Sequence, residues 1–198
     1  MSPEPTTTPA PPAPRIVQRL DRFQRAPYSV RERLTRMLWA GLNLTVWKLP
    51  RAWALRRALL RAFGAKLGRH VTFRASVTVV HPWLLDVGEW TTIGDRVTIY
   101  NLGPVRIGSH TTLSQDTYVC AGTHDYQISF LPLVRSPVTI GSGVWVAAQC
   151  FIGPGVTIGD NVMVGARSVV AKDLPPNVVA AGHPARPIKP RVMKDDPT

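Results

Sequence analysis

One aliphatic side chain returns every six residues between Val138 and Val170. A small residue follows each of them, so that the pairs are Ile140-Gly141, Val146-Ala147, Ile152-Gly153, Ile158-Gly159, Val164-Gly165 and Val170-Ala171. A period of six is neither the 3.6 of a helix nor the 2 of a plain strand. It is typical of a hexapeptide repeat, in which three short strands and three corners make one coil of a parallel β-helix. The pattern therefore predicts an all-β fold with the aliphatics pointing inward and Gly at the corners.

The same phase extends toward the N-terminus with small slips. Its earlier members are Leu67, Phe73 and Val79, then Val87, Ile93 and Ile99, then Ile107, Leu113 and Val119. The largest break covers residues 120–137, and an insertion of this length predicts a loop that leaves the prism. Such loops carry function more often than the coil itself does.

These boundaries divide the 198 residues into four parts. We expect a disordered Pro-rich tail at 1–14, a basic amphipathic helical segment at 15–64 and a β-helix domain at 65–172. Residues 173–198 are expected to form a Pro-rich cap and tail that cannot continue the coil.

The positive charge is concentrated in the helical segment. The chain has a formal net charge of +12, and fifteen Lys and Arg between Arg15 and Arg74 face two acidic residues. A Leu stripe containing Leu34, Leu38 and Leu42 runs through this segment, with Pro50 as a break and Gly64 as the stop. Two interpretations stay open: the stripe binds an anionic membrane, or it packs on the first coil and leaves a solvated basic face.

Compartment signals are few. The two cysteines, Cys120 and Cys150, are too few for a disulfide framework, and a buried free thiol is expected for Cys150. The first fourteen residues lack the apolar core of a signal peptide, and no apolar run reaches the roughly 20 residues of a spanning helix. We therefore expect a cytoplasmic protein, with membrane association left open.

Among five histidines, His124 stands out because it lies on the long insertion. Imidazole is the usual general base near neutral pH. Cys120 lies four residues earlier, but its repeat phase favours a packed thiol over a nucleophile. Asp125 could orient an imidazole or face water, and Tyr126 could line an acceptor site or the loop core. Trp145 alternates with Val144 and Val146, so its ring should point outward toward a ligand or another subunit.

At these residues the chain resembles the hexapeptide-repeat acyltransferases. The motifs are T-H-D-Y in the insertion, P-V-T-I-G-S-G-V-W-V-A-A, P-G-V-T-I-G-D-N-V and V-V-A-K-D-L-P-P-N-V-V-A-A-G-H-P-A-R-P-I-K. They are similar to the galactoside and maltose acetyltransferase group. Phe63-Gly64-Ala65-Lys66, His81-Pro82-Trp83 and Tyr100-Asn101-Leu102 resemble the colanic-acid-type exopolysaccharide acetyltransferases more closely. The resemblance covers about residues 60–190 and is most specific in the C-terminal half.

The resemblance implies a left-handed β-helix, a homotrimer and acetyl-CoA bound between neighbouring prisms, without a metal. It implies that His124 is the catalytic base, that Trp145 lies beside the pantetheine arm and that backbone groups of Ala148 and Ala166 bind that arm. The positions matched near the nucleotide are Ala171, Lys172, Arg186 and Lys189. Ala171 stands where Thr is common in relatives. Lys189 stands where Arg is common, so the two parallel hydrogen bonds that a guanidinium could donate to a phosphate are lost. The resemblance also implies that Asn101 falls near the position at which relatives orient the acceptor sugar, and Asp125 and Tyr126 join it as candidate substrate-binding residues.

The chemistry of these residues supports acyl transfer independently of the family resemblance. A thioester is already activated, so acyl transfer needs a base for the acceptor hydroxyl and a donor for the developing oxyanion. Lys172 and Arg186 could bind CoA phosphates, although a solvated cap would also contain them.

The leading hypothesis is a CoA-dependent O-acetyltransferase acting on a sugar hydroxyl in exopolysaccharide or lipid-linked saccharide synthesis, without nucleic acid as partner. A serine or amino-sugar acyltransferase is the nearest alternative, because a fold and a donor do not fix the acceptor. A zinc carbonic anhydrase would need three converging histidines. A non-catalytic scaffold would bind no CoA.

Overall fold

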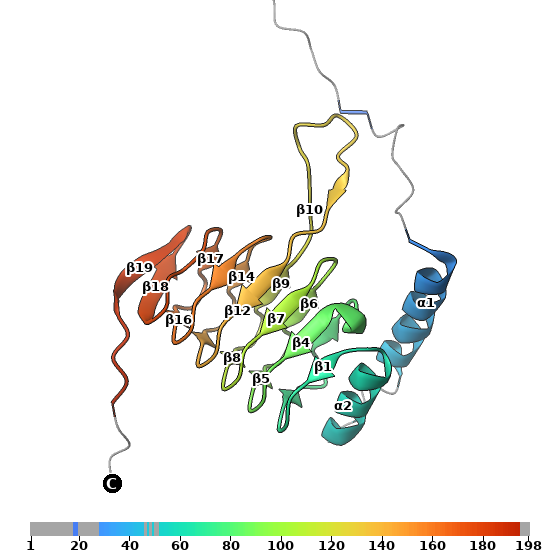
Figure 1. Ribbon diagram of the computed structural model, residues 1–198, viewed down its shortest axis with the longest axis horizontal. Coiled ribbons are helices and arrows are strands. Elements are labelled where there is room, and N and C mark those ends of the chain that lie inside the picture. Colours follow the sequence, from blue (N-terminus) through green and yellow to red (C-terminus); the bar gives the residue numbers. More distant parts are fainter. Residues whose placement is uncertain (1–17, 20–27, 46, 48, 50–51, 195–198) are drawn as a thin grey trace, which may run out of the picture.

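The chain forms a three-sided prism of parallel β-helix with two helices at its first coil (Figure 1). The computed structural model describes residues 18–19, 28–45, 47, 49 and 52–194. The first sheet contains β1 (Lys66–Leu67), β4 (Leu85–Val87), β7 (Val105–Ile107), β12 (Val138–Ile140) and β15 (Thr157–Ile158). The second contains β2 (Thr72–Phe73), β5 (Thr92–Ile93), β8 (Thr112–Leu113), β13 (Trp145–Val146), β16 (Met163–Val164), β18 (Val178–Gly182) and β19 (Ala185–Pro190). The third contains β3 (Thr78–Val79), β6 (Thr98–Tyr100), β9 (Tyr118–Cys120), β14 (Phe151–Ile152) and β17 (Val169–Val170).

The core is a column of inward side chains along the prism axis. The aliphatics of the six-residue period from Ile140 to Val170 are at most 1% exposed, and Phe73 takes the inward place in its coil at 1%. Each strand contributes one or two such side chains and bonds to the strands of the coils on either side. The prediction of a parallel β-helix from the repeat is confirmed.

Corners require close backbone approach. We call the turn from the first to the second sheet the first corner, the next the second corner, and the return to the first sheet the third corner. At the first corner, a Cβ on Gly108 would lie 2.5 Å from the backbone nitrogen of Ser142 in the next coil. Real Cβ atoms do not approach backbone this closely, so the repeat needs Gly here for space.

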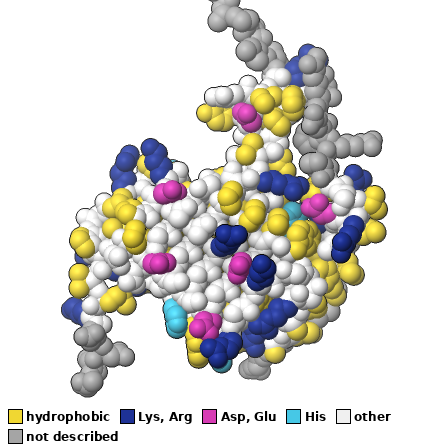
Figure 2. Space-filling view, in the orientation of Figure 1, with side chains coloured by type: hydrophobic (Ala, Val, Ile, Leu, Met, Phe, Trp, Pro, Cys, Tyr) yellow, Lys and Arg dark blue, Asp and Glu magenta, His cyan; other side chains and the backbone are white. Residues whose placement is uncertain are grey.

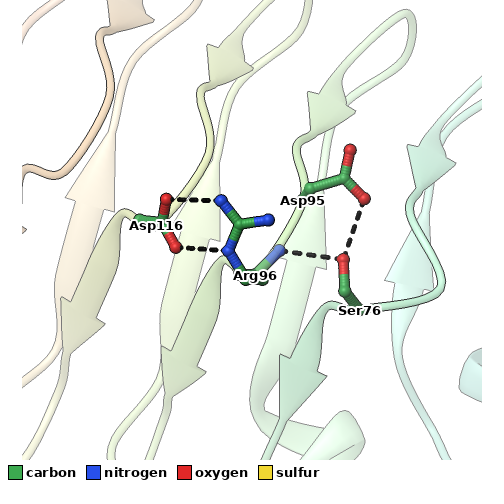
Figure 3. A network of polar contacts seen from close by, with 4 residues as sticks. All are labelled: Ser76, Asp95, Arg96 and Asp116. Atoms are coloured by element: carbon green, nitrogen blue, oxygen red, sulfur yellow. Dashed lines mark hydrogen bonds and ion pairs between the residues drawn. The ribbon is translucent and has the colours of Figure 1, made fainter.

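The second corner carries a polar ladder along the coil axis (Figure 3). Arg96 donates two hydrogen bonds to the carboxylate of Asp116, at 2.7 and 2.8 Å, one coil further on. On its other side, its backbone N–H donates to the Ser76 hydroxyl, which donates to Asp95. The guanidinium lowers the pKa of the Asp116 carboxyl. The ion pair lies at the surface, with the Arg96 side chain 63% exposed, so its contribution to stability is small.

The insertion leaves the prism at the third corner. It follows β9 and returns to β12, and it folds back through an antiparallel pair, β10 (Thr123–His124) and β11 (Leu133–Val134). Figure 1 shows this arm projecting away from the three sheets. The loop predicted for residues 120–137 is therefore a β-arm.

Two helices cover the first coil: α1 (Val30–Leu44) and α2 (Trp53–Ala62). Ser29 caps α1, and its hydroxyl accepts from the backbone N–H of Glu32 at 3.1 Å. Gly64 follows α2 with φ of +91°, as predicted for its stop. Pro50, predicted to break the helical run, lies outside the described residues.

The helices attach through tryptophan and arginine. The indoles of Trp39 and Trp47 donate to the carbonyls of Val79 and Val77, at 2.7 and 2.9 Å, on the edge of the third sheet. Two guanidiniums of α2 donate to carbonyls of the first coil: Arg57 to Val71, and Arg61 to Leu67 and Gly68. These bonds satisfy the open edge of the first coil.

Of the two interpretations left open for the Leu stripe, packing on the first coil does not hold for Leu34 and Leu38. Leu34 and Leu38 are 62% and 61% exposed, whereas Trp39, on the opposite side of α1, is 3% exposed. Because the indole brings both apolar area and a donor, it fits an edge of unpaired carbonyls that leucine cannot satisfy.

The C-terminal segment continues the coil, against expectation. Leu174 forms a parallel bridge with Ile158 of the first sheet, and β18 pairs in parallel with β16. Only then does β19 turn back antiparallel on β18. Pro175 and Pro176 precede β18 and Pro184 lies between β18 and β19, whereas Pro187 and Pro190 are part of the edge strand β19.

Other sequence-based expectations have mixed outcomes. Cys150 is buried and both cysteines are free, and burial raises the pKa of the Cys150 thiol. Neither helix in the described part of the chain has the length and hydropathy that a membrane crossing needs. The tail predicted at 1–14 lies outside the described residues.

Candidate active site

His124 lies on β10 with an exposed side chain. Its Nδ1 lies 2.6 Å from the carbonyl oxygen of Leu131 across the arm. A carbonyl only accepts, so Nδ1 carries the proton in this contact. In the neutral ring the lone pair is then on Nε2. The arm thus holds an imidazole in the tautomer that can accept a proton from a hydroxyl.

The tip of the arm is a compact turn. The Asp125 carboxylate accepts from the backbone N–H of Gln127 at 3.0 Å, and the Asp125 N–H donates to Pro132. Asp125 therefore shapes the turn, and it is the Leu131 carbonyl that orients His124. Tyr126 is 84% exposed and is not part of a loop core.

Trp145 points outward from the second sheet, as predicted, and is 46% exposed. Its indole donates to the hydroxyl of Ser114 at 3.1 Å, which fixes the ring over the face. Trp145 is in register with Met163, Met163 with Val179, and Val179 with Lys189. With strands about 4.8 Å apart, the ring and Lys189 lie roughly 14 Å apart along one row.

Ala148 and Ala166 stack at the second corner, next to that face. The Arg167 N–H donates to the Ala148 carbonyl at 2.9 Å, which joins the two turns one coil apart. Arg186 on β19 is paired with Ala181 on the adjacent strand β18, and its side chain is exposed. The second corner therefore brings backbone groups and a guanidinium beside the Trp145 row.

Ala171 and Lys172 are exposed and lie at the third corner, after β17. Sheet order places β17 two strands from β9, the strand that leads into the arm. Lys172 is therefore roughly 10 Å along the axis from the base of the arm.

The prism separates these groups into two sets. The arm leaves at the third corner, which is the corner opposite the second sheet. Within one chain, His124 and the Trp145 row therefore lie on opposite sides of the molecule (Figure 1). The family resemblance implied a donor bound between neighbouring prisms, and the separation within one chain agrees with that expectation; the six-residue period by itself gave no sign of it.

Known proteins share this architecture and these motifs. Residues 137–172 match the family described as bacterial transferase hexapeptide (six repeats). The chain is 43% identical over 157 residues to the Escherichia coli K12 protein named "Putative colanic acid biosynthesis acetyltransferase WcaF", covering 78% of this chain and 86% of that protein. It belongs to the hexapeptide-repeat acyltransferases.

Further members extend the comparison. Galactoside O-acetyltransferase of Escherichia coli K12 is 33% identical over 162 residues, covering 80% of this chain and 68% of that protein. The crystal structure of a maltose O-acetyltransferase from Clostridium difficile 630 has a TM-score of 0.74 at 30% identity, covering 84% and 92% of the two chains. A galactoside acetyltransferase in complex with coenzyme A has a TM-score of 0.76 at 26% identity, covering 89% and 94%. The fold of this acyltransferase is accordingly the left-handed β-helix that the resemblance implied.

Asn101 is not presented to a ligand in this acyltransferase chain. It has no exposed surface. Its amide oxygen accepts from the backbone N–H of His81 at 2.9 Å, and its nitrogen donates to the His81 carbonyl at 2.6 Å. In this structure Asn101 therefore holds the backbone of His81 at the third corner. Contrary to the expectation, it is not positioned to contact the acceptor.

His81 itself was missed by the sequence reasoning. It is 1% exposed, its Nδ1 lies 3.1 Å from the Asn101 carbonyl, and its Nε2 has no partner. Burial, with Arg36 and Arg135 nearby, lowers the pKa of His81 to about 4, so the ring stays neutral. The Leu131 carbonyl was also missed, because a main-chain acceptor carries no sequence signal.

A metal centre has no support in the described part of the chain. Groups of three or more His, Cys, Asp or Glu positioned to hold a metal ion are absent there. The three converging histidines that a zinc carbonic anhydrase requires are not brought together by the described residues.

Proposed function

We propose that this protein is an acetyl-CoA-dependent O-acetyltransferase that acetylates a sugar hydroxyl in exopolysaccharide or lipid-linked saccharide synthesis. The observation that carries the proposal is the imidazole of His124, held with Nδ1–H on the Leu131 carbonyl and Nε2 open. The names of the relatives, an acetyltransferase of colanic acid biosynthesis and a galactoside O-acetyltransferase, support a saccharide acceptor.

The chemistry follows from that tautomer. His124 Nε2 takes the proton of the acceptor hydroxyl as its oxygen attacks the thioester carbonyl. The tetrahedral intermediate then collapses, the bond from carbon to sulfur breaks, and the imidazolium returns the proton to the CoA thiolate. The products are an acetyl ester and free CoA. Since the thioester is already activated, no covalent enzyme intermediate is needed.

The donor would lie against the second sheet and second corner of one chain, whereas Ala171 and Lys172, which lie at the third corner with the arm, would reach it from the neighbouring chain that supplies His124. Lys172, Arg186 and Lys189 are exposed cations suited to the phosphates of CoA. Trp145 offers an aromatic surface for the pantetheine arm, with Ala148, Ala166 and Ala171 leaving room for it beside the backbone. On the acceptor side, exposed Tyr126 and the Asp125 turn flank the base.

We further infer that the active site is shared between chains, in a homotrimer. A single prism places His124 opposite its own Trp145 row. In the proposed trimer the arm, which projects from its own prism (Figure 1), would instead contact the second sheet of a neighbour. If the same head-to-tail contact is repeated until the ring closes, the arm of every chain meets the donor face of a neighbour, and no arm or donor face is left unpaired. Because the donor is a cytoplasmic metabolite, we place the enzyme on the cytoplasmic side.

A thiol-release assay tests the function. The purified protein is given acetyl-CoA and a panel of sugars, nucleotide sugars, lipid-linked saccharides, amino sugars and serine. Release of CoA that requires a sugar hydroxyl, with an acetyl ester identified in the product by mass spectrometry, is expected. An amide product would assign the N-acyltransferase alternative instead, and no release with any acceptor, with no CoA binding, would identify a scaffold.

The donor site has its own test. Lys172→Ala and Arg186→Ala should each raise the KM for acetyl-CoA roughly 10- to 100-fold with a smaller change in kcat, because phosphate contacts bind ground and transition states alike. Arg106→Ala, an exposed arginine on the first sheet, is the matched control. If both variants bind CoA as tightly as the parent by calorimetry, the nucleotide site lies elsewhere.

A further inference from the structure

The outer face of α1 is apolar, although this face points away from the prism. It is defined by Val30, Leu34, Met37, Leu38 and Leu44, each at least 61% exposed. These positions follow the spacing i, i+4, i+7, i+8 and i+14 along the helix, which is one side of an α-helix. An ordinary surface helix would place this side against the core.

The opposite side of α1 is the one that packs, and it is largely polar. Trp39 is buried and bonded to the Val79 carbonyl. Buried polar atoms of Arg36 and Asn43 lie on the same side. The orientation of α1 is therefore fixed by the indole bond, so the apolar side cannot turn inward without breaking it.

Apolar surface continues beyond the outer face. A groove of about 710 Å³ opens between α1 and the end of α2, and Leu38 lines it together with Phe63 and Trp83. Trp53 and Leu55 of α2 add further exposed side chains at this end of the molecule. Figure 2 shows hydrophobic side chains along the edge where the two helices lie. Contiguous apolar surface of this kind marks an interaction site.

The surroundings of this face are basic. The two helices contain six arginines and one acidic residue, Glu32. Those that bond coil carbonyls, such as Arg57 and Arg61, keep their charge because a carbonyl does not neutralise them. Arg31 and Arg33 are exposed beside the stripe. The net positive charge of the segment from Arg15 to Arg74 is larger than the net charge of the whole chain.

We propose that the outer face of α1 docks on the surface of an anionic lipid bilayer, with α1 lying in the interface plane. Apolar side chains enter the boundary between headgroups and acyl chains, and the flanking arginines meet lipid phosphates. A second copy of this chain fits less well, because two basic faces would oppose each other. A bilayer offers the complementary charge.

If the proposed function is correct, docking through α1 also affects how the acceptor reaches the active site. The arm and the helices belong to one chain, so binding through α1 would also bring His124 close to the membrane surface. An acceptor carried on a lipid would then be delivered in two dimensions. The docking itself is tested without acetyl-CoA, so it stands or fails apart from the catalytic assignment.

Co-sedimentation of the full-length protein with vesicles is the experiment. Vesicles of phosphatidylcholine alone are compared with vesicles containing about one third phosphatidylglycerol, at low salt and at about 0.5 M salt, where screening is strong. The variant Leu34→Gln/Met37→Gln removes apolar surface without touching a buried group. Val192→Gln/Met193→Gln, at the other end of the chain and 81% and 61% exposed in the parent, is the matched control.

The parent should bind only the anionic vesicles, and high salt should release it. The α1 variant should bind at least about tenfold more weakly, and the control variant like the parent. Arg31→Gln/Arg33→Gln should lower binding to anionic vesicles at low salt. Sedimentation equilibrium completes the test: if Leu34→Gln/Met37→Gln lowers the oligomer mass, the face is a subunit interface and the proposal is wrong. A parent that stays in the supernatant with anionic vesicles at low salt also overturns it.

Discussion

Leu131 has a left-handed backbone conformation, with φ of +50°, at the residue whose carbonyl receives His124. Leucine adopts this region rarely, so the arm accepts local strain there. The result is a main-chain acceptor aimed at the ring in place of a carboxylate. The carbonyl orients the ring by accepting from Nδ1–H, and it leaves Nε2 open to the acceptor hydroxyl.

Replacing His124 should remove the base and little else. His124→Asn is expected to lower kcat about 10²- to 10⁴-fold while leaving affinity for CoA and the oligomer mass near the parent values. His110→Asn is the matched control, because His110 is also exposed and lies at the first corner. Unchanged turnover of His124→Asn at saturating substrate would remove His124 from the mechanism.

His81 makes stability depend on pH. Its pKa is lowered to about 4 in the fold, mainly by burial, whereas the unfolded chain has a value near 6.5. Between these values the unfolded chain binds a proton that the folded chain does not, so stability falls as pH drops from 6.5 toward 4. A shift of this size corresponds to roughly 3 kcal/mol of unfolding free energy.

Urea denaturation at pH 7 and pH 4.5 checks this dependence. The parent should lose stability between the two values, and His81→Gln, which cannot titrate, should lose less. Arg36 and Arg135 both disfavour the charged ring, so Arg135→Gln should narrow the pH difference slightly. Equal pH differences in the parent and His81→Gln would show that other groups control acid stability.

The inward residues were predictable at this scale because they recur strictly every six residues. The six aliphatics of this period, from Ile140 to Val170, all occupy core positions. Asn101 was assigned to the acceptor from a resemblance of short motifs. Its burial follows from two bonds to the backbone of His81, and pairing with a main chain leaves no mark on residue type.

At the scale of elements, the helices show where pattern reading fails. An apolar stripe predicts a helix and its period, but not which side meets the core. In α1 the deciding factor is the open edge of β3, whose carbonyls need donors. Leucine supplies none, so the tryptophans pack there and the stripe faces outward. The β-arm was predicted only as a loop, since a two-residue pairing is too short to show a period of two.

The indole bond should carry much of the attachment of α1. Trp39→Phe keeps an aromatic ring but leaves the buried Val79 carbonyl without its donor, so a loss of about 1–3 kcal/mol is expected. Trp53→Phe changes a ring that is 42% exposed and should stay within about 0.5 kcal/mol of the parent. The urea midpoints of the two variants and the parent at pH 7 measure these losses of stability. Equal losses would mean that ring size, and not the bond, anchors the helix.

At the scale of the molecule, the triangular section decides how a site can be assembled. The three sheets are related by sequence order, so the corner that releases the arm lies opposite the face that holds Trp145. Repeat periodicity predicts the prism but contains no information on which faces meet in an assembly. The proposed shared site rests on the family resemblance and on the positions of the arm and the face in three dimensions.

Mixing inactive chains tests the shared site. His124→Asn and Trp145→Ala chains, each of low activity alone, are unfolded together and refolded at equal amounts. If an arm serves a neighbouring face, random trimers should contain about a quarter of sites with both native residues and regain that share of activity. Separately refolded chains, combined afterwards without exchange, are the control. A site built within one chain would give no recovery.

The antiparallel strand β19 ends the second sheet, and its outer edge carries Pro187 and Pro190 beside Arg186 and Lys189. Proline has no N–H to offer a further strand, and like charges repel an identical edge. At the other end, the indoles and guanidiniums of the helices occupy the first coil. Because open strand edges can pair with other chains, we expect these two covered ends to hinder end-to-end polymerisation. Arg186 and Lys189, proposed above to hold the nucleotide, would therefore also hinder end-to-end association, and we expect a chain that lacks β19 to aggregate more readily than the parent.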